Sequence, residues 1–175
     1  MSNLERSAVT AAAVLVAAVA VILGALAFEH IGGFAPCPLC LEQRYAYYVA
    51  IPVLILAMAL SQRRHLMSAA MLLAVVAALF VANAGLAGYH AGAEWKLWPG
   101  PDSCAASDAS LATGGGLLKD LETTHVVRCD EAALRILGLS LAGWNVLISL
   151  ALAAGASAAA IEAWRGAGPA RDRPR

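Results

Sequence analysis

The sequence contains four cysteines, and their number and spacing suggest redox chemistry. Cys37 and Cys40 form a C-x-x-C within Cys37-Pro38-Leu39-Cys40, and Cys104 and Cys129 follow much later in the chain. Redox enzymes use the C-x-x-C spacing to hold a disulfide that exchanges easily with other thiols. Four cysteines allow three pairings, and spacing alone does not choose among them. The sequence therefore predicts thiol–disulfide chemistry and leaves the pairing open.

Metal binding and haem attachment are alternative uses of the same C-x-x-C. A structural zinc site needs four ligands, typically from two such pairs, and this sequence has a single C-x-x-C. Covalent haem attachment needs a histidine directly after the second cysteine, where Leu41 stands. We therefore expect no metal and no haem. Purely structural disulfides remain an alternative.

The elements that must position these cysteines are membrane helices. Of the 175 residues, 61% are hydrophobic and 14% are charged, against about 45–50% and about 25% in soluble domains. Apolar stretches near the roughly 20 residues that span a bilayer predict helices at about 8–28, 41–60, 66–88 and 136–161. We expect an all-α membrane protein in which residues 1–175 form a single four-transmembrane-helix bundle. The formal net charge is zero, so the sequence lacks the excess of basic residues that is typical of nucleic-acid-binding proteins.

Positive charges set the expected orientation of the bundle. Arg6, Arg63, Arg64 and Arg165 lie outside the apolar stretches on what would be one side, and the positive-inside rule makes this side cytoplasmic. Both termini are then cytoplasmic. The short loop at about 29–40 and the long loop at about 89–135 are periplasmic and hold all four cysteines, on the side where disulfides persist.

The first apolar stretch also has a competing interpretation as a secretory signal peptide. Ala25-Leu26-Ala27 resembles a cleavage site. The apolar run before it is about 20 residues long, whereas the apolar core of a signal peptide has about 7–15. The length favours a retained membrane helix.

Arg44 follows Cys40 at a spacing that places both on one helix face. If the second helix begins near Cys40, that thiol lies at the helix N-terminus, where the macrodipole favours a thiolate. A thiolate beside a fixed cation at the membrane surface suits electron delivery to a lipid-soluble acceptor. The alternative is that Arg44 only extends its charge to the lipid headgroups.

Polar and small residues inside the apolar stretches predict contacts between helices. Asn83 and Asn145 are expected to hydrogen-bond between helices, and Gly85 and Gly88 to allow close helix packing.

The long loop has features of a reactive segment. An aromatic stretch from Tyr89 to Trp98 leads into a turn, 114–116 is a glycine hinge, and 117–122 is expected to form a short amphipathic helix on the bilayer. Such a loop can carry Cys104 and Cys129 between a soluble partner and the C-x-x-C. The alternative is a passive connector.

Together these motifs resemble the disulfide bond formation protein B family, DsbB. The resemblance rests on Cys37-Pro38-Leu39-Cys40 with Gln43-Arg44, on Tyr89-His90 with Glu94-Trp95 and Gly100-Pro101-Asp102-Ser103-Cys104, and on Cys129-Asp130 leading to Leu139-Ser140-Leu141-Ala142-Gly143-Trp144-Asn145. It covers the chain from the first helix to the fourth. C-x-x-C alone is a weak signal, and the combination is specific.

The resemblance implies a protein-disulfide oxidoreductase of the bacterial inner membrane that supports disulfide bond formation. Its partner would be a DsbA-like periplasmic thioredoxin-fold oxidase, and its cofactor a membrane quinone, either ubiquinone or menaquinone; this route keeps the periplasm oxidising. The partner would attack Cys104, Cys129 would exchange with Cys37, and Cys40 would pass electrons to the quinone. Arg44 and His90 are the implied quinone-binding residues.

Two other functions remain as alternatives. A reductase of the vitamin K epoxide reductase type also joins C-x-x-C to quinone chemistry, but there the motif is expected late in the bundle, and here it follows the first helix. A non-enzymatic scaffold or small transporter would use its cysteines only to brace loops. Transporters usually carry charges or broken helices near the midplane, and three of the four stretches here are uncharged.

Overall fold

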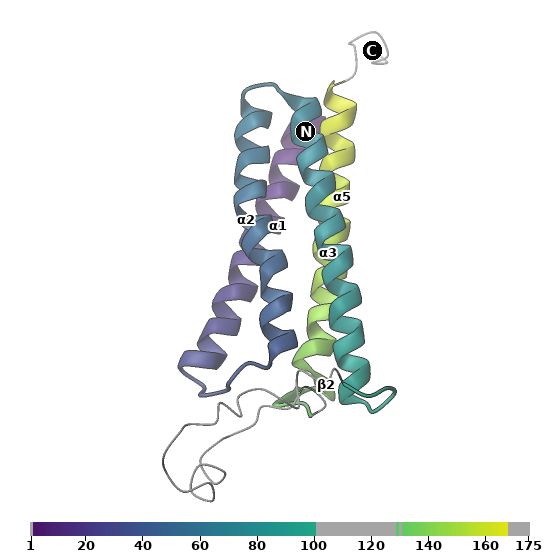
Figure 1. Ribbon diagram of the computed structural model, residues 1–175. Coiled ribbons are helices and arrows are strands. Elements are labelled where there is room, and N and C mark those ends of the chain that lie inside the picture. The colour runs from purple at the N-terminus through teal and green to yellow at the C-terminus, as the bar shows by residue number, and fades with distance from the viewer. Residues whose placement is uncertain (1, 101–128, 130, 168–175) are drawn as a thin grey trace, which may run out of the picture.

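The computed structural model describes residues 2–100, 129 and 131–167, and these form a bundle of long helices (Figure 1). The helices are α1 (Asn3–His30), α2 (Pro38–Gln62), α3 (Leu66–Glu94) and α5 (Leu141–Ala167). All four are long and apolar enough to cross a membrane, which confirms the predicted four-helix membrane bundle. Cys104, the glycine hinge and the expected amphipathic helix at 117–122 lie outside the described residues.

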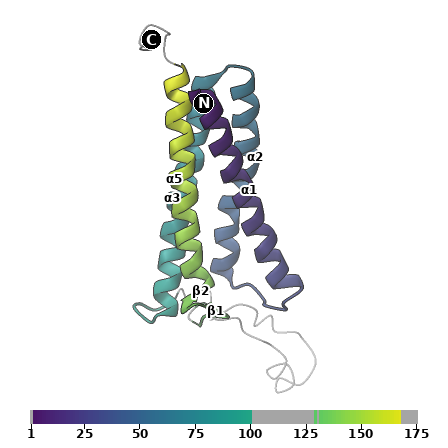
Figure 2. The ribbon, with the colours of Figure 1, turned by 180° about the vertical axis from the view of Figure 1, so that it is seen from behind.

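The helices alternate in direction, so the bundle has two distinct ends. α1 begins and α5 ends at one end, together with the link between α2 and α3 (Figures 1 and 2). The start of α2, the end of α3 and the start of α5 meet at the other end. The C-x-x-C lies at the start of α2 and is therefore at this second end, which we call the cysteine end.

Small residues let the helices pack closely. Ala18, Ala50 and Ala156 have no exposed surface, and an added Cβ at Gly155 would stand 2.7 Å from the Val14 side chain. Alanine and glycine at such positions let backbones approach, which is the main source of packing between membrane helices. Gly85 and Gly88 do not have the expected packing role, because a Cβ added at either would meet nothing within 4 Å.

All four helices extend beyond their expected bounds because their end turns contain polar residues, and α5 continues to Ala167 rather than ending near 161. α1 begins at Asn3 rather than near residue 8, and Ser2 and Glu5 cap it by reciprocal hydrogen bonds of 2.8 and 3.3 Å. α2 begins at Pro38 rather than near 41. α3 continues to Glu94 rather than ending near 88, so its last turn includes residues that we expected in the loop.

The fourth helix begins later than expected because a small hairpin precedes it. Strands β1 (Arg135–Ile136) and β2 (Leu139–Ser140) pair antiparallel. The two residues between them, Leu137 and Gly138, both have positive φ, 52° and 84°, as in the type I′ turns that join hairpin strands. The predicted helix start at 136 was wrong: Ser140 accepts a hydrogen bond of 3.1 Å from the Gly143 amide as α5 begins.

Candidate redox site

Cys37 caps the start of α2, and Cys40 lies in the first turn of that helix. Cys37 is the N-cap residue, its Sγ accepts the Cys40 N–H at 3.2 Å, and Pro38 occupies a first-turn position that needs no amide donor. Our sequence interpretation put Cys40 at the helix N-terminus, whereas Cys37 is the residue that caps it. Both sulfurs thus lie in the positive end of the helix dipole.

Both thiols are free, and their sulfurs are 2.7 Å apart. Cys37 is 3% exposed, while Cys40 is partly exposed. The hydrogen bond to Cys40, together with burial, raises the pKa of the Cys37 thiol well above its usual value. The Cys37 thiol therefore holds its proton more tightly than an ordinary cysteine does.

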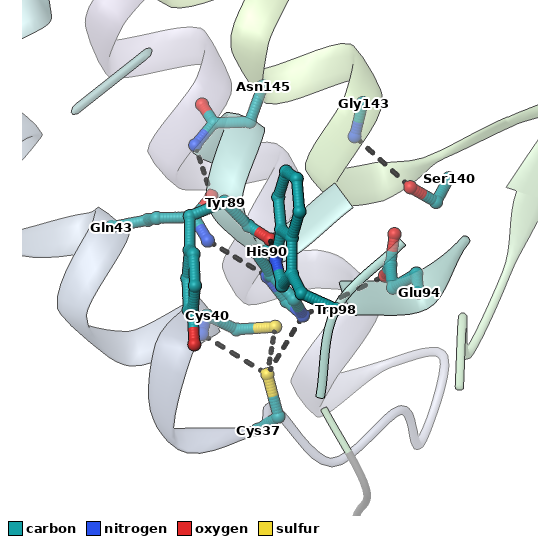
Figure 3. A network of polar contacts seen from close by, with 10 residues as sticks. All are labelled: Cys37, Cys40, Gln43, Tyr89, His90, Glu94, Trp98, Ser140, Gly143 and Asn145. Atoms are coloured by element: carbon teal, nitrogen blue, oxygen red, sulfur yellow. Dashed lines mark hydrogen bonds and ion pairs between the residues drawn. The ribbon is translucent and has the colours of Figure 1, made fainter. Parts of the chain in front are cut away.

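His90 reaches the cysteine pair from the last turns of α3. Its side chain is buried, and its Nε2 lies 3.6 Å from Cys37 Sγ and 3.8 Å from the Oε1 of Glu94 (Figure 3). On the other side of the ring, Nδ1 lies 2.9 Å from the amide nitrogen of Gln43 on α2. His90 is therefore fixed on both ring nitrogens.

A chain of hydrogen bonds leads from His90 into the interior of the bundle. The Tyr47 hydroxyl donates to Asn145 Oδ1 at 2.6 Å, and Asn145 Nδ2 donates to Gln43 Oε1 at 2.6 Å. Because the Gln43 oxygen accepts from Asn145, the Gln43 group next to His90 is the amide nitrogen, which donates to His90 Nδ1. Nδ1 therefore carries no proton, and the single proton of the neutral ring is on Nε2, which faces Cys37. A residue of α5 thus orients a residue of α3 through one on α2.

Arg44 is held by an ion pair at the end of α1. Its Nη1 lies 2.5 Å from the Oε2 of Glu29, and its side chain is 12% exposed. Sequence reasoning placed Arg44 beside Cys40, and both residues line the same cavity. The ion pair fixes one edge of the guanidinium, and its planar shape leaves other N–H groups for a further acceptor.

A cavity of about 330 Å³ lies between the four helices beside Cys40. Its walls are mainly apolar and include the rings of Phe28, Phe34 and Trp144, and the polar residues on its lining are Cys40, Gln43, Arg44, Tyr47, His90 and Asn145. Sequence reasoning did not select Gln43, Tyr47 or Asn145 as site residues. A signal was present for the first two, because they follow Cys40 by three and seven positions and so share its helix face.

Cys129 packs against the first cysteine pair. It is 1% exposed and forms one small buried cluster with Cys37 and Leu39. The His90 ring hydrogen-bonds to the Cys129 backbone. Cys129 is disulfide-bonded, and because Cys37 and Cys40 are free, its bond is to neither of them. The fold therefore brings three of the predicted cysteines together, and the fourth, Cys104, lies outside the described residues.

The chain after α3 folds back over the outer side of this site. Trp98 stacks on Tyr89 with ring centroids 5.9 Å apart and donates to the Tyr89 carbonyl at 2.9 Å. Position 92 has to be glycine, because any added Cβ would overlap the Trp98 ring. Glu94 follows two residues later; it is 8% exposed, and its Oε2 has no hydrogen-bond partner among the described residues.

Comparison with known proteins identifies the family. The protein-family model described as "Disulfide bond formation protein DsbB" matches residues 6–159 of the sequence, which is most of the chain. The chain belongs to the DsbB family. It is 29% identical over 136 residues to disulfide bond formation protein B 1 of Pseudomonas fluorescens Pf0-1, covering 73% of this chain and 74% of that protein. No solved structure matches the chain.

Two further relatives share parts of the sequence. An uncharacterized protein of Rickettsia prowazekii is 23% identical over 127 residues, 71% of this chain and 70% of its own length. Disulfide bond formation protein B 1 of a second P. fluorescens strain, Pf-5, is 39% identical over 71 residues, 41% of this chain and 40% of that protein. Membership of the DsbB family makes this chain a multi-pass membrane protein of disulfide bond formation and supports an oxidoreductase activity.

Proposed function

We propose that this DsbB-family protein reoxidises a DsbA-like periplasmic thiol oxidase and passes the electrons to a membrane quinone. The observation that carries the proposal is the gathering of Cys37, Cys40 and Cys129 at one place. Cys37 and Cys129 belong to one small buried cluster, and the Cys37 sulfur lies 2.7 Å from that of Cys40, which lines the cavity. The loop cysteine thus lies in the same cluster as the pair whose second sulfur faces the cavity.

The proposed relay begins with the soluble partner. A thiolate of the reduced partner attacks Cys104 in a Cys104–Cys129 disulfide, which forms a mixed disulfide and releases Cys129 as a thiolate. Cys129 then attacks Cys37 in the Cys37–Cys40 disulfide, and Cys40 leaves as a thiolate. The contact between Cys129 and Cys37 supports this order of attack. The partner's second thiol then resolves the mixed disulfide and frees Cys104, which attacks Cys129 in the Cys37–Cys129 disulfide, re-forms Cys104–Cys129 and releases Cys37 as a thiolate. Two electrons have then moved from the partner to Cys37 and Cys40.

The cavity beside Cys40 fits a quinone ring. Its volume of about 330 Å³ is within the range of about 300–1,000 Å³ that small-molecule sites occupy. Aromatic and aliphatic walls suit a flat ring with an apolar tail, and Arg44 offers N–H donors to a carbonyl oxygen. When bound, a quinone supplies a sink for two electrons and two protons. Ubiquinone and menaquinone both have this chemistry.

The residues of this chain divide the remaining tasks. Cys40 gives up the electrons, and Glu29 holds Arg44 at the cavity wall. His90 lines the cavity and also contacts Cys37. Its Nε2–H can donate to the Cys37 sulfur when that sulfur is released by Cys129, which stabilises the developing negative charge. In this proposal the electrons from the partner pass to the quinone from Cys40, and His90 stabilises the thiolate of Cys37.

The proposed location is the bacterial inner membrane with the cysteine end facing the periplasm. Arg63 and Arg64 lie at the opposite end, in the link between α2 and α3, and Arg165 lies near the end of α5. The positive-inside rule puts these residues in the cytoplasm, together with both termini.

Stopped-flow reduction of added quinone by the reduced partner, with each cysteine replaced in turn, tests the proposal. Cys104→Ser should abolish exchange with the partner and leave Cys37–Cys40 oxidisable by quinone. Retained turnover with the partner would refute the relay. A purified protein that binds no quinone and reduces none in a thiol-dependent way would favour a scaffold with structural disulfides.

A further inference from the structure

The donor atoms around the first cysteine pair also form a set of metal ligands. The two cysteine sulfurs and an imidazole nitrogen of His90 all lie within 4.8 Å of one another. We propose that the reduced protein binds a thiophilic divalent cation, Zn²⁺, through Cys37, Cys40 and His90. Thiolate and imidazole are the ligands that Zn²⁺ prefers in proteins. The sequence pattern did not reveal this set, because the third ligand comes from a different helix.

The distances in the reduced site are close to those of a tetrahedral zinc centre. Zn–S bonds of about 2.3 Å and Zn–N bonds of about 2.0–2.1 Å put a sulfur and a nitrogen ligand roughly 3.6 Å apart and two sulfurs roughly 3.8 Å apart. Cys37 Sγ and His90 Nε2 are already 3.6 Å apart. The sulfurs are 2.7 Å apart and must separate by about 1 Å, for which the cavity beside Cys40 leaves space.

His90 is held in the orientation that a metal ligand needs. Its ring is buried, Nε2 faces the sulfurs, and Gln43 contacts Nδ1 at 2.9 Å. Metal-bound histidines almost always donate the other ring N–H to a fixed acceptor. With the cation on Nε2, the ring proton moves to Nδ1. Half-turns of the Gln43 and Asn145 amides then present the Gln43 oxygen to that proton and the Asn145 oxygen to the Gln43 N–H, while the Tyr47 hydroxyl accepts from the Asn145 amide.

A fourth ligand is available at Glu94. Its Oε1 lies 3.8 Å from His90 Nε2, and its Oε2 has no hydrogen-bond partner among the described residues. The side chain is 8% exposed, Ser140 hydrogen-bonds to it and Arg135 acts on it electrostatically. Oε2 is therefore the oxygen that remains for a cation.

Binding depends on the redox state and involves no electron transfer. Zn²⁺ replaces the protons of the two thiols, which leave to the solvent, and two Zn–S bonds form. A Cys37–Cys40 disulfide has no thiolate to offer, so only the reduced form binds. The cation occupies both sulfurs and therefore blocks their oxidation; this inhibitory effect rests on the proposed function, whereas binding itself does not.

Cobalt titration tests the site without an activity assay. The full chain carrying Cys104→Ser and Cys129→Ser, freed of quinone and reduced under anaerobic conditions, leaves the first pair as its only thiols. Co²⁺ should bind at about one ion per chain, with a near-ultraviolet sulfur-to-cobalt charge-transfer band, visible bands of tetrahedral cobalt, and displacement by Zn²⁺. Absence of these bands, or the same bands in the protein with an intact Cys37–Cys40 disulfide, would overturn the site.

Variants of the surrounding residues separate this site from a simple dithiol. Gln43→Leu should weaken binding by about 10–100-fold, as loss of an outer-shell partner does, and His90→Ala should weaken it further. Ser7→Ala is the control, because it removes a buried polar group whose hydrogen bond goes to the Ala159 carbonyl at the opposite end of the bundle. Unchanged affinity in both Gln43→Leu and His90→Ala would show that the cysteines act alone and refute the site.

The activity assay then distinguishes the two proposals. If the metal-free parent protein reduces no quinone but shows the cobalt bands, the proposed function fails and the metal site stands. If the parent turns over and shows no bands, the metal site fails alone.

Discussion

The two ends of the bundle each contain a cavity, but only one cavity is surrounded by linked polar groups. The opposite end holds a space of about 220 Å³ between α1, α2 and α3, lined by aliphatic side chains and by the polar residues Glu5, Ser7, Ser61 and Gln62. At the cysteine end the cavity is about 330 Å³ and meets a thiol, a guanidinium and an imidazole. Volume therefore does not distinguish the site; the polar atoms do.

The hydrogen bonds at the two ends also serve different purposes. At the opposite end Ser7 donates to the backbone carbonyl of Ala159 at 2.9 Å, and Ser61 Oγ has no partner among the described residues. At the cysteine end, side chains bond to side chains in series from Tyr47 to His90. A bond to backbone fastens one helix to another, whereas a series of side-chain bonds fixes the orientation of its last member.

Among the changes at the two ends, loss of Cys40 should reduce quinone reduction the most. Cys40→Ser removes the sulfur that faces the cavity, and quinone reduction driven by the partner should fall by at least about 10³-fold, as it does when a reacting nucleophile is removed. Stopped-flow spectroscopy of quinone reduction measures this loss. Turnover near that of the parent protein would mean that electrons leave from another residue.

Arg44→Ala should have the second-largest effect on quinone reduction. A charge-assisted hydrogen bond contributes about 1.5–3 kcal/mol, so the KM for quinone should rise by roughly 10–100-fold, with a smaller change in kcat. Steady-state kinetics over a range of quinone concentrations measures both constants. The matched control is Arg63→Ala, at the opposite end of the same helix, which should leave KM unchanged. An equal effect of the two variants would show that Arg44 acts only through membrane-surface charge.

Asn145→Leu should have a moderate effect, because it breaks the series of hydrogen bonds that reaches His90 through Gln43. Loss of one buried hydrogen bond costs about 1 kcal/mol, and we expect kcat to fall by about 5-fold. Nitrogen NMR of the His90 ring should show a mixture of the two tautomers instead of the single form with its proton on Nε2. Ser7→Ala, at the opposite end of the bundle, should leave the ring signals unchanged. A single unaltered tautomer in Asn145→Leu would contradict the role of this series.

Ser61→Ala should have the smallest effect, and its sign should be opposite. This change removes a buried hydroxyl without a partner, so the bundle should become more stable by up to about 1 kcal/mol. Thermal unfolding in detergent measures the change, and quinone reduction should be unaffected. A clear loss of activity would show that the two ends of the bundle are coupled.

Much of the cysteine end was predictable from local sequence. Cys37, Cys40 and Arg44 lie within eight residues of one another on one helix, so their proximity follows from helix geometry. Glu29 and Asn145 gave no such signal, since Glu29 lies on α1 and Asn145 on α5, where its interhelical bond was expected but its partner was not. The hairpin before α5 was missed because the apolar run from Ile136 hides a turn at Leu137 and Gly138.

The sequence by itself determined the four membrane helices, the redox chemistry and the end of the bundle where that chemistry lies. These features follow from composition, hydrophobic run length and short spacings, which are local properties of the chain. Only the tertiary structure decided that Cys129 packs on Cys37, that His90 joins the sulfurs, and that Asn145 orients His90 through Gln43. The rotation of each helix about its axis selects which side chains meet, and close packing of alanine and glycine against the other helices sets that rotation.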